Sequence, residues 1–271
     1  MQRLSSLLMR REHRWQNRFI VGLTGLALTA RFVLQRKQLS NPKHPLATSL
    51  DSLVTTSQMS LDDLITSGKS LIRWGDGDTM SAIGLTNSFE PRNLKLASEL
   101  REIVRRAPGE KDFILGLPMT FLAEDDRIRI PPERLRQWGL TLLLLSQSLR
   151  EPVAVFDSFA FRGLKGAPRR SKIITLPSVL ESVASKPLIV VGPAGMIEAV
   201  RKVGGHSLAG QVRVPESRAY ADVDEISEKV QELLDVFPEA ICLVSAGSAG
   251  RVVISRLCGR GQFIDIGQIA G

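Results

Sequence analysis

The sequence predicts an α/β protein with a Rossmann-like, mostly parallel sheet and helices on both of its faces. Short apolar runs alternate with amphipathic stretches from residue 51 onward. The runs are apolar at consecutive positions, which is typical of parallel strands buried on both faces. Several of them end in turns of glycine, serine and alanine that lead into the next amphipathic stretch, as strand–helix units do.

The apolar runs and the amphipathic stretches predict each element in chain order. Strands are expected at 70–74, 112–117, 152–156, 188–191, 212–214, 240–244 and 262–266. Helices are expected at 61–65, 94–104, 135–149, 195–203, 223–233 and 249–258. Ser60 is a suitable N-cap for the first helix, and Pro108-Gly109 ends the second.

The charge of the chain is distributed unevenly. The net charge of +8 lies entirely in residues 1–43, which hold nine basic residues and one acid, because the other residues hold 27 of each sign. Nucleic acid is therefore not an expected partner, and the aromatic content of 5% argues against a surface that stacks bases. We expect a basic amphipathic arm with its linker over residues 1–44 and one α/β domain over residues 45–271.

The arm contains an apolar run of twelve residues from Phe19 to Ala30, whereas about 20 are needed to cross a bilayer. One interpretation is a basic helix that lies on anionic lipid, and the other is a poorly ordered extension. Two cysteines, Cys242 and Cys258, are too few for a disulfide scaffold. We therefore expect a cytoplasmic protein, with peripheral attachment to the inner face of the plasma membrane through residues 1–43.

Ligands of parallel α/β sheets bind beyond the carboxyl ends of the strands, and the first expected strand ends in Arg-Trp-Gly-Asp-Gly-Asp at 73–78. Asp76 and Asp78 can turn their oxygens to one hard cation. Gly77 would let the backbone fold tightly between them, and Gly75 and Gly77 are expected among the residues that bind the cofactor. Arg73 can pair with a phosphate held on the same ion. A solvated Asp-Gly turn is the alternative interpretation.

Two later turns, at 192–195 and 245–250, run from a strand through small residues into a helix. Such turns expose backbone N–H groups that can bind an anion, and Gly247 and Ser248 are the expected contacts. Neither turn has the glycine pattern of nicotinamide-binding or P-loop proteins, so those cofactors are not expected. Close packing of each helix on its strand is the alternative.

The stretches 70–78, 243–250 and 261–268 together resemble the GT-D-fold glycosyltransferases. Those proteins have a strand that ends in R-x-G-D-G-E, then far downstream a strand, a small-residue turn, a helix and a terminal D-I-G-H strand. The similarity covers residues 55–268 in element order and is specific at its two ends. It implies that Asp76 and Asp78 hold a divalent metal, Mn²⁺ or Mg²⁺, that this metal holds the diphosphate of a UDP-sugar, and that Arg73 contacts the phosphate.

Three departures from the family pattern bear on catalysis more than on fold or nucleotide binding. Asp78 stands where the family has Glu, Gln268 stands where it has His, and the chain ends at Gly271, before an acidic and aromatic tail.

The expected function is a metal-dependent glycosyltransferase, a hexosyltransferase, with a nucleotide-sugar donor and a saccharide or glycolipid acceptor. If the reaction inverts the sugar, Asp157 or Glu216 could deprotonate the acceptor hydroxyl, whereas a retaining reaction needs no such base. One alternative is a non-catalytic nucleotide-sugar-binding protein, which Gln268 and the short C-terminus favour. A metal-dependent phosphatase is the other, although no distal acid pair accompanies Asp76 and Asp78.

Overall fold

The computed structural model describes residues 23, 26–31, 33–34, 54–55, 59–119, 132–149, 151–161, 173–204, 208–267 and 269. Its centre is an eight-stranded sheet in the order β1-β4-β3-β2-β8-β7-β5-β6, and every strand pair is parallel. The strands are β1 Val54–Thr55, β2 Ser70–Arg73, β3 Phe113–Leu117, β4 Val153–Asp157, β5 Leu188–Gly192, β6 Leu208–Arg213, β7 Ile241–Val244 and β8 Gln262–Asp265. The predicted α/β class is thereby confirmed.

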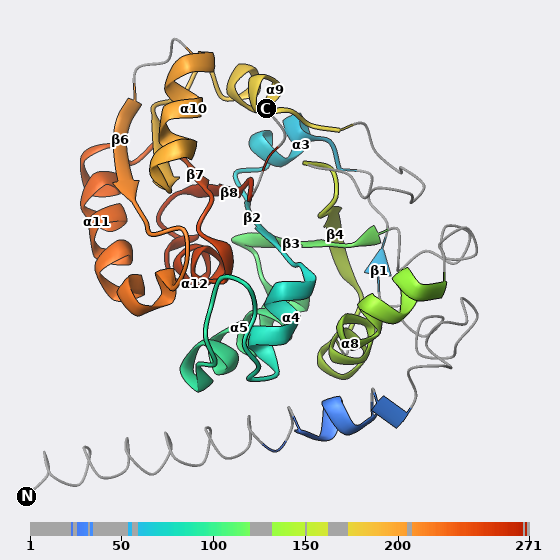
Figure 1. Cartoon of the computed structure of the whole chain (residues 1–271). Helices are drawn as coiled ribbons and strands as arrows, with labels where there is room; N and C mark the ends of the chain where they lie inside the picture. The colour runs from blue at the N-terminus through green and yellow to red at the C-terminus, as the bar shows by residue number, and fades with distance from the viewer. Residues whose placement is uncertain are drawn as a thin grey trace, which may run out of the picture.

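Helices cover both faces of the sheet (Figure 1). One face packs against α3 Leu61–Thr66, α9 Leu176–Ser182 and α10 Ala194–Gly204. The other packs against α4 Asp76–Ala82, α5 Leu94–Arg106, α8 Pro132–Ser148, α11 Val223–Val236 and α12 Gly247–Leu257, with short 3₁₀ turns at Ala107–Gly109 and Ala219–Asp222 (η3). Successive residues of each central strand alternate between the two cores, as Leu71 and Ile72 do. The strands are therefore buried on both faces, which explains their unbroken apolar runs.

Several predicted boundaries need correction. The segment that begins at Asp76 is not a turn but the first turn of α4, because Gly75 takes the N-cap position and Asp78 bonds back to it. Helix α12 begins at Gly247 rather than at residue 249. The pattern also missed β1 and α9, which are only two and seven residues long. Short elements such as these leave too little periodicity to recognise.

The described part of the arm consists of helical positions between residues 23 and 34. Leu28 is only 2% exposed and belongs to the core cluster beneath α5 and α8, whereas Leu26 and Leu34 are 70% and 83% exposed. No helix in the described residues is long and apolar enough to cross a membrane. The rest of the arm, the linker and Gln268 lie outside the described residues.

Candidate functional site

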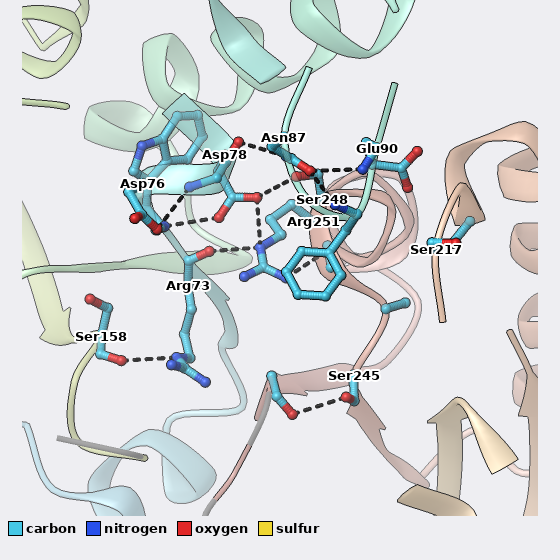
Figure 2. A pocket seen from close by; sticks show the side chains of 18 of the residues that line it. Arg73, Asp76, Asp78, Asn87, Glu90, Ser158, Ser217, Ser245, Ser248 and Arg251 are labelled. Atoms are coloured by element: carbon cyan, nitrogen blue, oxygen red, sulfur yellow. Dashed lines mark hydrogen bonds and ion pairs between the residues drawn. The ribbon is translucent and has the colours of Figure 1, made fainter. Parts of the chain in front are cut away.

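A cavity of about 450 Å³ opens at the carboxyl ends of the central strands (Figure 2). Its walls come from the segments that follow β2, β4, β5, β6, β7 and β8. The sheet order explains this position, because the neighbouring strands β5 and β7 lead in opposite directions, β5 outward to β6 and β7 inward to β8. A crevice at such a reversal is where open α/β sheets bind ligands. The volume is within the range of small-molecule sites.

Asp76 and Asp78 come from the first turn of α4, where the helix dipole favours negative charge. Asp78 is buried, and its Oδ2 accepts the Gly75 N–H at 2.9 Å while its Oδ1 accepts the Ser248 hydroxyl at 2.7 Å. Asp76 lies on the cavity wall, and its Oδ1 accepts the Gly77 N–H at 2.9 Å. Within the described part of the chain, no group donates to Asp76 Oδ2. The two carboxylates are therefore in different environments.

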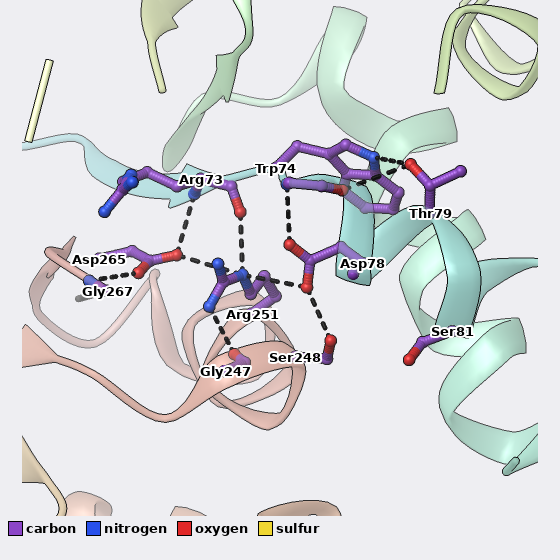
Figure 3. A network of polar contacts seen from close by, with 12 residues as sticks. Arg73, Trp74, Asp78, Thr79, Ser81, Gly247, Ser248, Arg251, Asp265 and Gly267 are labelled. Carbon is purple, nitrogen blue, oxygen red and sulfur yellow. Dashed lines mark hydrogen bonds and ion pairs between the residues drawn. The ribbon is translucent and has the colours of Figure 1, made fainter. Parts of the chain in front are cut away.

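The Arg251 side chain of α12 contacts residues of β2, α4 and β8, which lie far apart in the sequence (Figure 3). Its Nε donates to the Arg73 carbonyl at 2.9 Å and lies 3.3 Å from both Asp78 Oδ1 and Asp265 Oδ2. Its Nη1 donates to the Gly247 carbonyl at 2.5 Å. Burial lowers the pKa of Arg251, but attraction to Asp265 and Asp78 outweighs burial and leaves this pKa raised. Arg251 thus balances two buried acids and also lines the cavity.

Asp265, the last residue of β8, is fully buried. Its oxygens accept the N–H groups of Arg73 at 3.1 Å and Gly267 at 3.1 Å. Burial raises the pKa of Asp265, and the charges of Arg251 and Arg73 oppose this rise. Gly267 has a φ of 50°, and a Cβ at this position would lie 2.7 Å from Arg73 Nη1. Glycine suits this position because of its left-handed backbone, and a side chain here would displace the Arg73 guanidinium.

The Arg73 guanidinium reaches the cavity wall but also has a structural role. Its Nε donates to the Ser158 carbonyl at 3.1 Å, its Nη1 donates to the Ile266 carbonyl at 2.6 Å, and its Cζ lies 5.0 Å from the Phe161 ring centre. These contacts tie β2 to the segments after β4 and β8. The predicted phosphate contact of Arg73 is compatible with its position and remains a prediction.

Gly247 and Ser248 both line the cavity at the N-terminus of α12, as expected for the predicted anion site. No side chain of the described residues caps this helix, and the first N–H groups of a helix have no partner within it. A Cβ on Gly250 would approach Val244 to 2.9 Å. Close packing and a helix N-terminus without a side-chain cap therefore coexist in this turn. The N–H groups of Gly75 and Gly77, by contrast, are used by Asp78 and Asp76.

The two predicted bases lie in different places. Glu216 is exposed and lines the cavity on the segment after β6. Asp157 ends β4 and its Oδ1 accepts the Phe159 N–H at 3.0 Å. The cavity lining includes Ser158 and Phe159 but not Asp157.

Sequence reasoning missed Arg251, Asp265, Asn87 and Glu90. The signal for Arg251 and Asp265 was a charge within an apolar stretch, Gly-Arg-Val-Val and Phe-Ile-Asp-Ile, since such charges are buried only when paired.

Glu90 is 4% exposed, and its Oε1 accepts the Tyr220 N–H at 3.0 Å. Burial raises the pKa of Glu90 against the effect of the backbone N–H groups that it accepts. Nothing local in the sequence marks Asn87 or Glu90.

Asp76 fits a metal ligand, because it lines the cavity and no group among the described residues donates to its Oδ2. Asp78 fits less directly, because Gly75, Ser248 and Arg251 already contact its two oxygens. The described residues contain no group of three or more His, Cys, Asp or Glu that could hold a metal ion. Mg²⁺ is commonly bound by one or two carboxylates together with substrate phosphates and water. The residues therefore suit a cation that arrives with a phosphorylated ligand.

The chain matches no family model, and no curated protein sequence matches it. Three solved structures are similar to it. One, described as the domain of unknown function 1792 with a distinct glycosyltransferase fold, has a TM-score of 0.61 and 21% identity over 83% of this chain and 81% of that one. Another, described as a new glycosyltransferase (DUF1792) from Streptococcus sanguinis, has a TM-score of 0.59 and 22% identity over 80% of this chain and 81% of that one.

The third, a selenomethionine-substituted DUF1792 domain, has a TM-score of 0.62 and 22% identity over 83% of this chain and 81% of that one. At this level of identity the similarity concerns the fold. The chain therefore has a fold like that of the DUF1792 domain, which is described as a glycosyltransferase fold.

Proposed function

We propose that this protein is a metal-dependent glycosyltransferase that uses a nucleotide-sugar donor, with UDP as the leaving nucleotide. The observation that carries the proposal is Asp76, which lines a cavity at the switch point of this sheet and whose Oδ2 accepts no hydrogen bond from the described residues. The similar structures described as a glycosyltransferase fold support it. Asp76 is the proposed protein ligand of Mn²⁺ or Mg²⁺, and Asp78 acts mainly by holding Ser248 and Arg251 in place.

Sugar transfer to an acceptor expels a nucleoside diphosphate, so negative charge grows on phosphate oxygens. A bound divalent cation supplies Lewis-acid stabilisation of that charge. The chain's own contribution is positive charge that is positioned before the reaction. Arg251 and Arg73 bring their guanidinium groups to the cavity wall, and the α12 N-terminus adds the N–H groups near Gly247 and Ser248.

Glu216 is the proposed base if the reaction inverts the sugar. It is exposed on the cavity wall, whereas Asp157 is not part of that wall. An exposed carboxylate retains freedom to approach an acceptor hydroxyl once the acceptor is bound.

Incubation with a panel of nucleotide sugars and Mn²⁺ tests the proposed reaction. We expect free UDP to be released from a UDP-sugar, and chelation of the metal to stop the release. The Asp76→Asn variant serves as the inactive control, because it replaces the proposed ligand at nearly constant volume. Hydrolysis of simple phosphate esters would instead indicate a phosphatase, and nucleotide binding without turnover would indicate a binding protein.

We further propose that the arm attaches the protein to anionic membrane, which would place it beside a lipid-linked acceptor. The eight excess positive charges lie in residues 1–43. Leu28 packs in the core while Leu23, Leu26, Val33 and Leu34 are exposed, so the described part of this helix contacts the body and still offers apolar side chains to another surface.

Vesicle co-sedimentation of the full chain tests the attachment. A variant that changes four arm residues to glutamine, Arg10, Arg11, Arg14 and Arg18, is expected to bind anionic vesicles at least about 100-fold more weakly. This follows from ~1 kcal/mol for each basic residue near the surface. The control variant changes four exposed basic residues of the body to glutamine, Arg105, Lys202, Lys229 and Arg260. Equal losses in the two variants would refute a specific role of the arm.

A further inference from the structure

Phe89 is an exposed aromatic side chain on the cavity wall. It is 45% exposed and lines the cavity. The other large apolar side chains that are exposed in the described residues belong to the arm helix, α10 or α11, and none of them lines the cavity. A phenyl ring left in water forgoes the favourable burial of its apolar surface. A ring in this position therefore calls for an explanation.

Hydrogen bonds from Asn87 fix Phe89 to the start of α4. Asn87 Oδ1 accepts the N–H groups of Phe89 and Glu90, both at 2.7 Å. Its Nδ2 donates to the Gly77 carbonyl at 2.8 Å and to Ser81 Oγ at 2.9 Å. The Asn87 side chain thus connects the backbone of Phe89 to Gly77, the residue that follows Asp76.

The segment after β6 holds Phe89 from the other side. The Arg218 N–H donates to the Phe89 carbonyl at 2.7 Å, and the Tyr220 N–H donates to Glu90 Oε1 at 3.0 Å. Arg218 has a φ of 59°, in the left-handed region that non-glycine residues rarely adopt. Strained backbone of this kind concentrates where a surface is held ready for a ligand. The side chain of Phe89 is therefore exposed, while its backbone is held from both sides.

We propose that Phe89 is the platform on which the nucleobase of the donor stacks, an inference that rests on the proposed nucleotide-sugar donor. Stacking suits a ring without a polar group, because every base has a π-face. A Cβ on Gly247 would lie 4.0 Å from Phe89 Cβ, so Phe89 is attached next to the first turn of α12, where the diphosphate is expected. Ser217, which also lines the cavity, can hydrogen-bond to the edge of the base.

Calorimetry with UDP and Mn²⁺ tests this role on the full chain. Phe89→Ala is expected to weaken UDP binding about 5- to 150-fold, which corresponds to ~1–3 kcal/mol for loss of one stacked base. Phe89→Tyr should bind UDP nearly as the natural protein does. Inorganic pyrophosphate, which lacks a base, should bind all three proteins equally. Val236→Ala on α11, where Val236 is 68% exposed, is the control for loss of an exposed apolar side chain.

Each of the following outcomes would overturn the stacking role of Phe89. Unchanged UDP binding by Phe89→Ala would remove the stacking role, and an equal loss for UDP and pyrophosphate would mean that the substitution disturbs the phosphate site instead. If UDP-glucose loses affinity and UDP does not, the ring stacks on the sugar. If the natural protein itself binds no UDP, the proposed donor fails together with this inference, and that result is recognised before any variant is measured.

Discussion

Replacing Arg251 with methionine is expected to lower the free energy of unfolding by about 3–5 kcal/mol, the typical cost of removing one partner from a buried ion pair. Asp78 and Asp265 would remain buried without the guanidinium that lies 3.3 Å from each. The Arg73 and Gly247 carbonyls would also lose a donor. Urea denaturation followed by circular dichroism gives the change, with an unaltered m-value as the sign that the same structure unfolds.

Arg256→Met provides the matched control, because Arg256 lies on the same helix and also contacts two acids, Glu99 and Asp224. Its side chain is 31% exposed and that of Asp224 is 76% exposed, so each pair is expected to contribute only about 0–1 kcal/mol. A similar loss of stability in both variants would show that Arg251 acts through its helix and not through the buried acids.

Changing Asp76 to asparagine is expected to weaken Mn²⁺-dependent UDP binding at least about 10- to 100-fold, the loss that removal of even an outer partner of a metal ligand causes. The amide oxygen of the new side chain can still accept the Gly77 N–H, so the start of α4 should persist. UDP affinity with and without Mn²⁺, measured by calorimetry, separates the loss of metal from a loss of fold.

Asp78→Asn is the informative comparison. It weakens the attraction to Arg251 and should lower stability, while the response of UDP binding to Mn²⁺ should persist in the variant that remains folded. The double variant should lose both the metal requirement and most of the affinity. If Asp78→Asn abolishes the metal response and Asp76→Asn does not, then Asp78 is the main ligand and must leave Ser248 and Arg251 to bind the ion.

Local patterns in the sequence were sufficient for the class of fold and for the side of the sheet that carries the cavity. Central strands are buried on both faces, so most of their residues are apolar at consecutive positions, and this signal needs no knowledge of the partners. The predicted order of strands and helices places small and acidic residues at the carboxyl ends of the strands. The cavity lining therefore includes Asp76, Gly247 and Ser248, as their positions after strands implied.

The arrangement of the site depends on which strands are neighbours, and that is decided by packing of the whole chain. Pairing of β2 with β8 brings Arg73 to Asp265, 192 positions later, and brings Asp78 to Ser248, 170 positions later. Such contacts leave no periodic trace, so a charge within an apolar stretch was the one sign of Arg251 and Asp265, and Glu90 had no sign. The sequence by itself determined the longer strands and helices and the sheet edge that carries the site. Only the tertiary structure decided that Asp78 is enclosed by Ser248 and Arg251 while Asp76 Oδ2 accepts no hydrogen bond from the described residues. Burial and hydrogen bonding of each carboxylate depend on residues distant in the chain.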